Sequence, residues 1–265
     1  MLNVILPANA VQSGLPGRIV DVRTHDHPPL TKPGYRLDPT GANTQLPPVQ
    51  GLLPDETALT DQMIKAGLLQ PGESLSDLPW LIFVDDDGGP VACRWVWALA
   101  VYGVNASMVD GGYQAAGCLT EPVTGIMCQP SLPELTCSAL IERQEMLDRL
   151  DDLSVRIVDA RSPAEFNGDD RRSDRGGHIP NAINLDWTQT QENRRFIAES
   201  QLKQILQQAD ITPDHEIWLY CQSHQRSSVW WVLLRALGYP CIRGYAGAWS
   251  DWGNCMDTPI KTDTL

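Results

Sequence analysis

The chemistry suggested by this sequence is concentrated at one cysteine, Cys221, which follows an apolar run and precedes a helix-forming segment. Residues 218–220 predict a buried strand, and residues 227–237, followed by Gly238, predict a helix. A loop between a strand end and a helix N-terminus directs several backbone N–H groups to one point, and such a nest favours an anion. The natural anion here is the thiolate, which is the nucleophilic form of cysteine.

The free energy needed to keep a thiol charged indicates what such a loop must supply. Lowering a thiol pKa by about two units from its free value requires roughly 2.7 kcal/mol. A helix N-terminus contributes about 0.3–1 kcal/mol, and about 2 kcal/mol at best. Loop N–H groups and the nearby cation Arg226 would have to contribute the rest. The alternative is that Cys221 is a packed structural cysteine, because free cysteines are often buried.

Composition limits the class of protein. The 265 residues are sufficient for two domains, and a formal net charge of −13 argues against binding to nucleic acid or to anionic lipid. No apolar run is long enough to span a membrane. Residues 1–10 lack the basic start and the cleavage pattern of a signal peptide. We therefore expect neither a nucleic-acid partner nor membrane association.

The cysteines show no C-x-x-C pair and no zinc-ligand spacing, so no metal or other cofactor is expected. An odd, scattered set of cysteines is typical of free thiols in a reducing compartment and predicts a cytoplasmic protein. Cys241 and Cys255 are interpreted as packing residues. The full set is Cys93, Cys118, Cys128, Cys137, Cys221, Cys241 and Cys255.

The chain contains an internal repeat. Residues 19–23 resemble residues 157–161, and the apolar run 81–84 resembles the run 217–220 that leads to Cys221. A Trp-rich helical pattern and a glycine turn follow the second landmark in both halves. Short apolar runs that alternate with helical patterns predict mainly parallel sheets with helices on both faces. The sequence therefore predicts two similar α/β domains in tandem.

The predicted domains are residues 1–117 and 141–265, joined by a linker over 118–140 that is rich in turn residues. Residues 24–52 are rich in proline and predict an irregular loop that wraps the first domain. Apolar positions within residues 141–150 predict a helix at the start of the second domain.

Four motifs of the second half resemble the rhodanese (sulfurtransferase) family, and in particular its tandem two-domain members. The resemblance is strong over residues 145–255 and weaker over 10–117. It implies two rhodanese-like domains, each a mainly parallel β-sheet flanked by α-helices, and sulfur transfer through a cysteine persulfide. The motifs are Val158-Asp159-Ala160-Arg161-Ser162-Pro163-Ala164-Glu165-Phe166, Arg175-Gly176-Gly177-His178-Ile179-Pro180-Asn181-Ala182, Tyr220-Cys221, and Gly244-Tyr245-Ala246-Gly247-Ala248-Trp249.

The resemblance implies that Cys221 takes sulfur from a small donor, thiosulfate or 3-mercaptopyruvate, and passes it to cyanide or a thiol. Arg226 suits thiosulfate oxygens because its guanidinium is always charged. Arg175 is expected to point toward the substrate pocket, although the charge pattern of residues 171–175 equally allows a surface arginine. The other residues expected at the pocket are Gln222, Ser223, His224, Gln225, Ser227 and Trp249.

Two further residues of these motifs are expected to support the site rather than react. Asp159 ends a strand and is expected to bind loop N–H groups or to pair with Arg161. His178 is expected to fix a turn. In the first half, the position that matches Cys221 falls at or next to Asp86, and a carboxylate cannot carry a persulfide. The first domain is therefore predicted to be inactive and to cover the site of the second.

The loop departs from both common subtypes of the family, so the donor stays open. Thiosulfate-type loops place basic residues where this chain has Gln222 and Ser223, and 3-mercaptopyruvate-type loops read Cys-Gly-Ser-Gly, so that Ser223 matches but Gln222 and His224 do not. The two cations Arg226 and Arg175 favour thiosulfate as the donor, because thiosulfate is a dianion. The alternatives are a rhodanese-fold phosphatase, whose loop has one residue more before its arginine, and a non-catalytic persulfide carrier or regulatory module.

Overall fold

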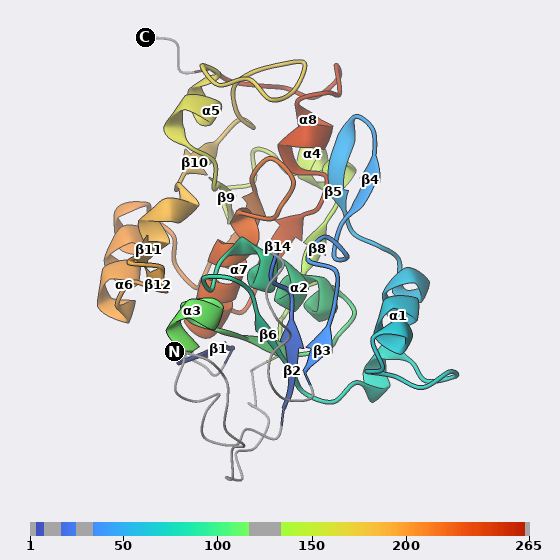
Figure 1. Ribbon diagram of the computed structural model, residues 1–265. Coiled ribbons are helices and arrows are strands. Elements are labelled where there is room, and N and C mark those ends of the chain that lie inside the picture. The colour runs from blue at the N-terminus through green and yellow to red at the C-terminus, as the bar shows by residue number, and fades with distance from the viewer. Residues whose placement is uncertain (1–3, 8–16, 25–33, 117–133, 263–265) are drawn as a thin grey trace.

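Two five-stranded parallel sheets form the framework of the protein (Figure 1). The computed structural model describes residues 4–7, 17–24, 34–116 and 134–262. The strands of the first sheet, in spatial order, are β1 (Ile5–Leu6), β7 (Ala106–Val109), β6 (Leu81–Val84), β2 (Arg18–Asp21) and β3 (Tyr35–Arg36). Those of the second are β10 (Ala182–Asn184), β9 (Val155–Asp159), β13 (Glu216–Tyr220), β14 (Ile242–Tyr245) and β8 (Leu140–Ile141).

The two sheets have the same topology, and every neighbouring pair of strands within them is parallel. Asp21 at the end of β2 pairs with Val84 of β6, and Asp159 at the end of β9 pairs with Tyr220 of β13. The predicted α/β architecture of two tandem units is therefore confirmed. The matched registers also identify the residue after Val84, Asp85, as the counterpart of Cys221.

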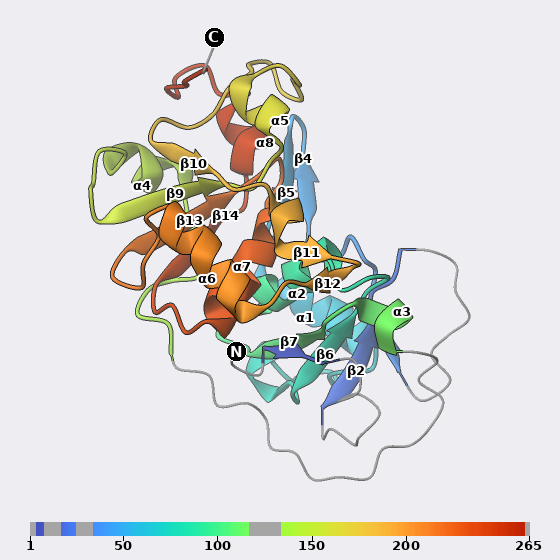
Figure 2. The same ribbon diagram turned by 90° about the vertical axis from the view of Figure 1, so that its left-hand side faces the viewer.

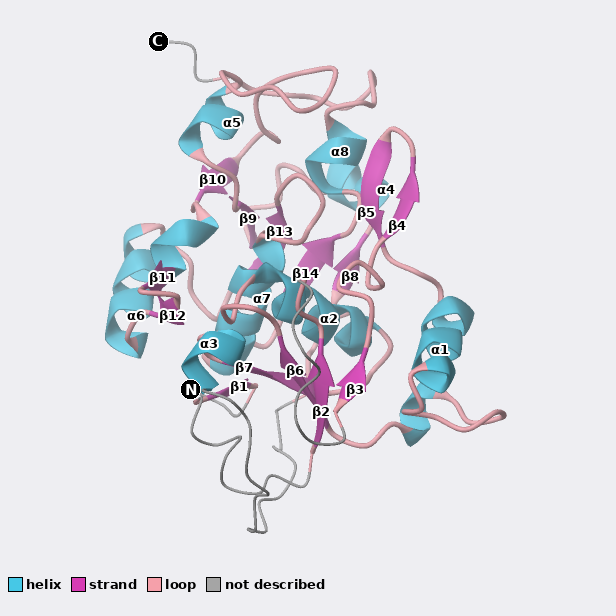
Figure 3. Ribbon diagram, viewed as in Figure 1, coloured by secondary structure: helices cyan, strands magenta, loops and turns pink. Residues whose placement is uncertain are grey.

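Helices cover both sheets, as the view coloured by secondary structure shows (Figure 3). Those of the first unit are α1 (Glu56–Lys65), η2 (Leu75–Asp77), α2 (Pro90–Val101) and α3 (Gly112–Ala116). Those of the second are α4 (Arg143–Asp148), α5 (Pro163–Asn167), η3 (Trp187–Thr190), α6 (Glu199–Gln208), α7 (Ser227–Ala236) and α8 (Ala248–Trp252).

Helices α2 and α7 lie side by side between the two sheets and join the units (Figures 1 and 2). Every residue of α7 is buried, and so are residues 92–99 of α2, which is typical of helices enclosed on all sides. Trp97 of α2 donates a hydrogen bond to the Ala139 carbonyl in the second unit (2.9 Å). One hydrophobic core therefore runs through both units.

Two stretches differ from the expected secondary structure. Within residues 24–52, the segment 25–33 lies outside the described residues, but the rest contains β3 and a hairpin of β4 (Thr44–Leu46) and β5 (Val49–Leu52) instead of an irregular loop. A second hairpin, for which the sequence analysis made no prediction, consists of β11 (Gln191–Glu192) and β12 (Arg195–Phe196). Residues 141–150 form a helix only from Arg143, because the buried Ile141 pairs with Tyr245 in the sheet.

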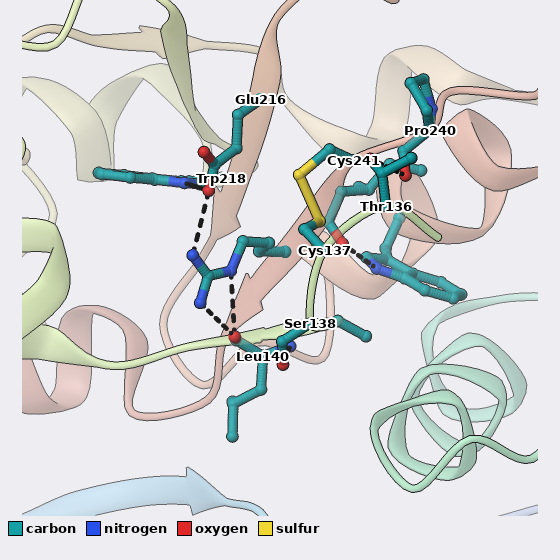
Figure 4. The surroundings of a disulfide bond; sticks show 12 residues. Thr136, Cys137, Ser138, Leu140, Glu216, Trp218, Pro240 and Cys241 are labelled. Carbon is teal, nitrogen blue, oxygen red and sulfur yellow. Dashed lines mark hydrogen bonds and ion pairs between the residues drawn. A yellow bond between two sulfur atoms is a disulfide. The ribbon is translucent and has the colours of Figure 1, made fainter. Parts of the chain in front are cut away.

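Cys137 and Cys241 form a disulfide, which corrects the interpretation of Cys241 as a packing residue (Figure 4). Their Cα atoms are 5.3 Å apart, and the neighbouring Thr136 N–H donates to the Pro240 carbonyl (2.8 Å). The bond ties the segment before β8 to the segment before β14. Cys93, Cys221 and Cys255 are free, and the expectation of a cytoplasmic protein stays a prediction.

Most of the predicted linker, residues 118–140, lies outside the described residues, as do Cys118 and Cys128, so the domain boundaries stay predictions. In the part of the chain that the structure describes, no helix combines the length and apolar character needed to cross a membrane. The described residues also contain no group of three or more histidine, cysteine or acidic side chains arranged to hold a metal ion.

Candidate active site

The Cys221 loop, residues 221–226, connects β13 directly to α7. Cys221 itself is 1% exposed. His224 adopts a left-handed backbone conformation (φ 55°), and its Nδ1 atom is hydrogen-bonded to Ser227 Oγ at 2.7 Å. The ring of His224 meets the edge of Trp97, with 4.3 Å between the ring centroids. Since burial lowers the pKa of His224 well below its usual range, this side chain is a neutral structural element of the loop.

The backbone of the loop leaves its donors unused. Within the described chain, the N–H groups of residues 222–228 donate to no protein acceptor. The carbonyl oxygens of Cys221 and Gln222 accept hydrogen bonds from the N–H groups of Trp249 and Ser250, each at 2.9 Å. Burial of the sulfur alone would fit a packed cysteine equally well. A run of unused N–H donors at the start of a buried helix favours the anion-binding interpretation instead.

Arg226 closes the loop, but its guanidinium faces Glu165 of α5. Its two terminal nitrogens donate to the two carboxylate oxygens at 2.6 and 2.8 Å. Burial disfavours the Glu165 charge, but the Arg226 hydrogen bonds and charge outweigh it and lower the pKa of Glu165 to about 2. The guanidinium that we expected to bind thiosulfate oxygens thus binds the Glu165 carboxylate instead. Arg226 therefore acts on the Cys221 sulfur mainly through its nearby charge.

Asp159 and His178 both make buried contacts within the second unit, and their supporting roles stay predictions. Asp159 is fully buried and pairs with Arg161, its oxygens accepting hydrogen bonds of 2.9 and 2.5 Å. His178 stacks on Phe166 with 3.6 Å between ring centroids, and its Nδ1 atom lies 2.9 Å from the Phe166 carbonyl. Trp249 is buried beneath the Arg161 guanidinium, 4.4 Å from its ring centroid.

Arg175 does not lie where the substrate-pocket prediction placed it. Its guanidinium donates to the main-chain carbonyls of Trp252 and Thr258, each at 2.8 Å, and also to the carbonyl of Cys255. These contacts fasten the segment after α8, because one planar cation satisfies several carbonyl groups at once. Arg175 therefore has a structural role, and its side-chain hydrogen bonds within the described residues all go to the segment 252–258, not to the Cys221 loop.

The first unit covers the Cys221 loop with its β4–β5 hairpin. Gly51 of β5 has a positive φ of 78° and lies so close that a Cβ atom there would be 2.3 Å from the Ser223 carbonyl oxygen. The Gln50 N–H donates to Ser250 Oγ (2.8 Å), which in turn lies 2.9 Å from the Gln50 carbonyl. The predicted role of the first unit as a cover is thus seen at the level of individual contacts.

A cavity of about 470 Å³ lies between this hairpin and the loop that carries Arg171 and Arg172. Gln222 connects the cavity wall to the Cys221 loop, because its side-chain amide donates to the Ser173 hydroxyl (3.2 Å) and to the Arg172 carbonyl (3.3 Å). Arg171 and Arg172 line the cavity together with Asp174, and within the described residues the Cys221 loop reaches its wall only through the Gln222 side chain.

The sequence analysis did not single out three residues that make long-range contacts around the Cys221 loop, namely Arg94, Glu165 and Ser250. Arg94 was recognisable as a single cation in an otherwise apolar helical pattern, and Glu165 as the fourth residue of a Ser-x-x-Glu capping box. Ser250 carries no signal of its own. Each of the three acts through a residue far away in the sequence, which a linear pattern does not reveal.

The counterpart loop in the first unit, residues 85–90, is named the Asp85 loop here. Asp85 is 3% exposed, and its carboxylate accepts hydrogen bonds from the N–H groups of Gly88 (2.6 Å), Gly89 (3.0 Å) and Ala92 (3.0 Å). We expected the matching residue at or next to Asp86, and the register identifies Asp85. A carboxylate thus fills the nest of the first unit, and this loop holds no nucleophilic sulfur.

The fold and the site define a class of protein: a two-unit α/β protein with a buried cysteine at the end of a strand, in front of a buried helix. A model of the rhodanese-like domain matches residues 142–255. The thiosulfate sulfurtransferase of Azotobacter vinelandii is 35% identical over 238 residues, which cover 86% of this chain and 84% of that protein. The thiosulfate sulfurtransferase of Pseudomonas aeruginosa is 34% identical over the same shares.

Among solved structures, the 3-mercaptopyruvate sulfotransferase SseA of Escherichia coli superposes with a TM-score of 0.68 at 21% sequence identity, covering 93% of this chain and 99% of that one. A likeness at this identity shows the shared fold. Together with the two relatives above, it establishes that the chain belongs to the tandem rhodanese-domain sulfurtransferase family.

Proposed function

We propose that this protein moves sulfane sulfur from thiosulfate to a thiophilic acceptor, such as cyanide or a thiol, through a persulfide on Cys221. The observation that carries the proposal is the run of unused N–H donors over residues 222–228 around the only strand-end cysteine of the described chain. Two relatives named thiosulfate sulfurtransferase, each covering 86% of the chain, support thiosulfate as the donor.

In the first half-reaction, the Cys221 thiolate attacks the outer sulfur of thiosulfate. The new bond is the cysteine–sulfur bond of the persulfide, and the sulfur–sulfur bond of thiosulfate breaks. Sulfite leaves with the electron pair of that bond, so no external oxidant or reductant is required. The negative charge that was on the thiolate then resides on the persulfide, beside the loop whose N–H groups have no protein acceptor within the described chain.

In the second half-reaction, the carbon of cyanide, or the thiolate of a thiol acceptor, attacks the outer sulfur of the persulfide. The sulfur–sulfur bond breaks, thiocyanate or a new persulfide leaves, and the Cys221 thiolate is restored. The Cys221 loop therefore faces an anion in every state of the cycle. Donors that are fixed in place before the reaction stabilise such charge without reorganisation.

The basic surface around the cavity suits an anionic donor of either kind. Arg172 is about half-exposed (53%) at the cavity, and its charge attracts a dianion even though Asp170 and Glu165 pair with it and partly offset that attraction. 3-Mercaptopyruvate carries one carboxylate and is held less strongly by such a field at equal distance. Thiosulfate is therefore the donor that this surface favours.

Mass spectrometry of the intact protein tests the proposal. Protein stripped with cyanide is mixed with thiosulfate, and we expect the mass to increase by one sulfur atom and to return after renewed cyanide treatment. The Cys221→Ser form should gain nothing. A parallel incubation with 3-mercaptopyruvate identifies the better donor. A wild-type mass that does not change with thiosulfate would overturn the choice of donor, and no change with either donor would overturn the persulfide mechanism.

A further inference from the structure

Arg94 is a buried cation of the first unit, in the middle of α2. It is 1% exposed, and its guanidinium lies over the ring of Trp97, 4.4 Å from the centroid. It donates to the main-chain carbonyls of Ala42 (3.2 Å) and Gly51 (2.5 Å), and its remaining terminal nitrogen, Nη1, is buried without a hydrogen-bond partner. Within the described residues, Arg94 forms no ion pair with a carboxylate, so its charge has no conventional partner.

A charge in this position is expensive. Moving an ion from water into a protein interior is strongly unfavourable unless an opposite charge compensates it. Burial lowers the pKa of Arg94 to about 9, and the nearby Cys221 sulfur opposes that shift. At neutral pH the guanidinium is still protonated, since a base carries its proton at any pH below its pKa. A buried, charged side chain thus occupies a position in α2 where an apolar side chain would be less costly to bury.

The other charged groups around the sulfur largely cancel each other. Arg226 is paired with Glu165, and Asp159 is paired with Arg161. His224 lies between the loop and α2 and is neutral for the reason given above. Both Arg226 and Arg94 act on the sulfur through their charge, but Glu165 offsets much of the Arg226 charge, whereas Arg94 forms no ion pair within the described chain.

We propose that Arg94 of the first unit is the counter-charge of the Cys221 thiolate and of the persulfide formed on it. The persulfide part rests on the proposed function, whereas the thiolate part does not. The unit without a nucleophile thereby sets the reactivity of the unit that has one. Two carbonyls of its own unit, those of Ala42 and Gly51, aim the guanidinium, and the hairpin that carries Gly51 rests on Ser223 of the Cys221 loop.

The thiolate content of the protein against pH tests this proposal. It is measured as the ultraviolet absorbance of the thiolate, taken as the difference between each form and the same form carrying Cys221→Ser, so that the other cysteines cancel. Removing a nearby cation disfavours the thiolate. We therefore expect Arg94→Gln to move the midpoint of the titration upward by at least one pH unit, which is about a tenfold lower thiolate fraction below both midpoints.

Two variants separate charge from packing. Arg94→Lys keeps the charge and should restore most of the wild-type midpoint. Arg235 is the matched control, because it is buried in α7 (4% exposed) and forms no ion pair within the described residues, and its pKa is lowered by burial alone. Arg235→Gln should leave the midpoint unchanged. Superimposable curves for wild type and Arg94→Gln, or equal shifts for Arg94→Gln and Arg235→Gln, would overturn the proposal.

A second measurement covers the case in which Arg94→Gln does not fold. The unfolding midpoint of wild type is compared with that of Cys221→Ser over a range of pH. A thiolate held by Arg94 should make wild type gain stability relative to Cys221→Ser as pH rises through the titration midpoint. Parallel curves would overturn the proposal. None of these readouts uses a sulfur donor, so a failure of sulfur loading with normal titrations would count against the proposed function alone.

Discussion

The Asp85 loop and the Cys221 loop occupy the same place in the two units, and they differ in where the anion comes from. In the first unit, the Asp85 carboxylate accepts hydrogen bonds from the N–H groups three, four and seven residues further on. In the second unit, the N–H groups of residues 222–228 have no protein acceptor within the described chain. The fold therefore makes an anion-binding nest in both units, and one side chain decides whether the nest is filled or available for chemistry.

The loops also end differently. Five residues after Asp85 stands Pro90, the first residue of α2, which supplies neither a cation nor an N–H group. Five residues after Cys221 stands Arg226, which pairs with Glu165. Burial raises the pKa of Asp85 to about 6, although three main-chain donors oppose that shift. The first loop thus compensates the burial of its own charge only in part.

The comparison is tested most severely by making the second loop resemble the first. Cys221→Asp should reduce sulfur transfer by at least about 10³-fold, because a carboxylate cannot carry sulfur, while its oxygens fill the nest. Steady-state thiocyanate formation and the thermal unfolding midpoint are the measurements. Cys221→Ala is the control for loss of the thiol. If Cys221→Asp were less stable than Cys221→Ala, the loop amides would not favour an anion.

The pair that only the second loop has should contribute strongly to stability. Glu165→Gln leaves the Arg226 charge without its carboxylate, and breaking a buried pair in this way costs about 3–5 kcal/mol. Chemical denaturation at neutral pH measures this loss. Asp210→Asn, which breaks a surface pair with Arg156, is the control and should change the free energy of unfolding far less.

The same variant has a distinctive pH dependence. The pKa of Glu165 is about 2 in the folded protein, against an ordinary value of 4.5. Its ionised form therefore stabilises the fold fully above about pH 4.5, and this contribution is lost as pH falls toward 2. The stability difference between wild type and Glu165→Gln should shrink over that window. A constant difference would mean that packing, not charge, is responsible.

A smaller effect is expected when the first nest is emptied. Asp85→Ala leaves the N–H groups of Gly88, Gly89 and Ala92 without their acceptor and should destabilise the protein by about 1–3 kcal/mol. Asp85→Asn keeps an acceptor and is the matched control. Sulfur transfer per folded molecule should change little in either form. A loss comparable to that of Cys221→Asp would show that the Asp85 loop takes part in the chemistry.

The smallest expected effect concerns the contact that joins the cover to the site. Ser250→Ala removes the acceptor of the Gln50 N–H and should cost about 0.5–1.5 kcal/mol. Since the hairpin is then held less tightly, the alkylation rate of Cys221 should rise. Ser74→Ala, in an exposed turn of the first unit, is the control. An unchanged alkylation rate would mean that the hairpin does not limit access to the sulfur.

The parts that sequence reasoning predicted correctly depend on neighbouring residues. The strand before Cys221, the helix after it, and the pairing of Asp159 with Arg161 are all encoded within a few positions. Apolar periodicity and the repeat then led to both sheets, because the same pattern occurs twice.

The parts that were missed depend on contacts between distant segments. The partners of Arg94, Arg175 and Arg226 lie in other elements, and a guanidinium accepts many partners that spacing does not distinguish. The disulfide joins Cys137 to Cys241, and cysteine pairing cannot be deduced from sequence alone.

Cys221 is 1% exposed, and the β4–β5 hairpin of the first unit lies against Ser223, two residues after it. On the proposed mechanism, the hairpin that rests on Ser223 has to move before a dissolved thiol or oxidant reaches sulfur carried by Cys221. Loaded protein is then expected to keep its sulfur through purification, and the loaded and emptied forms should be treated as two distinct samples.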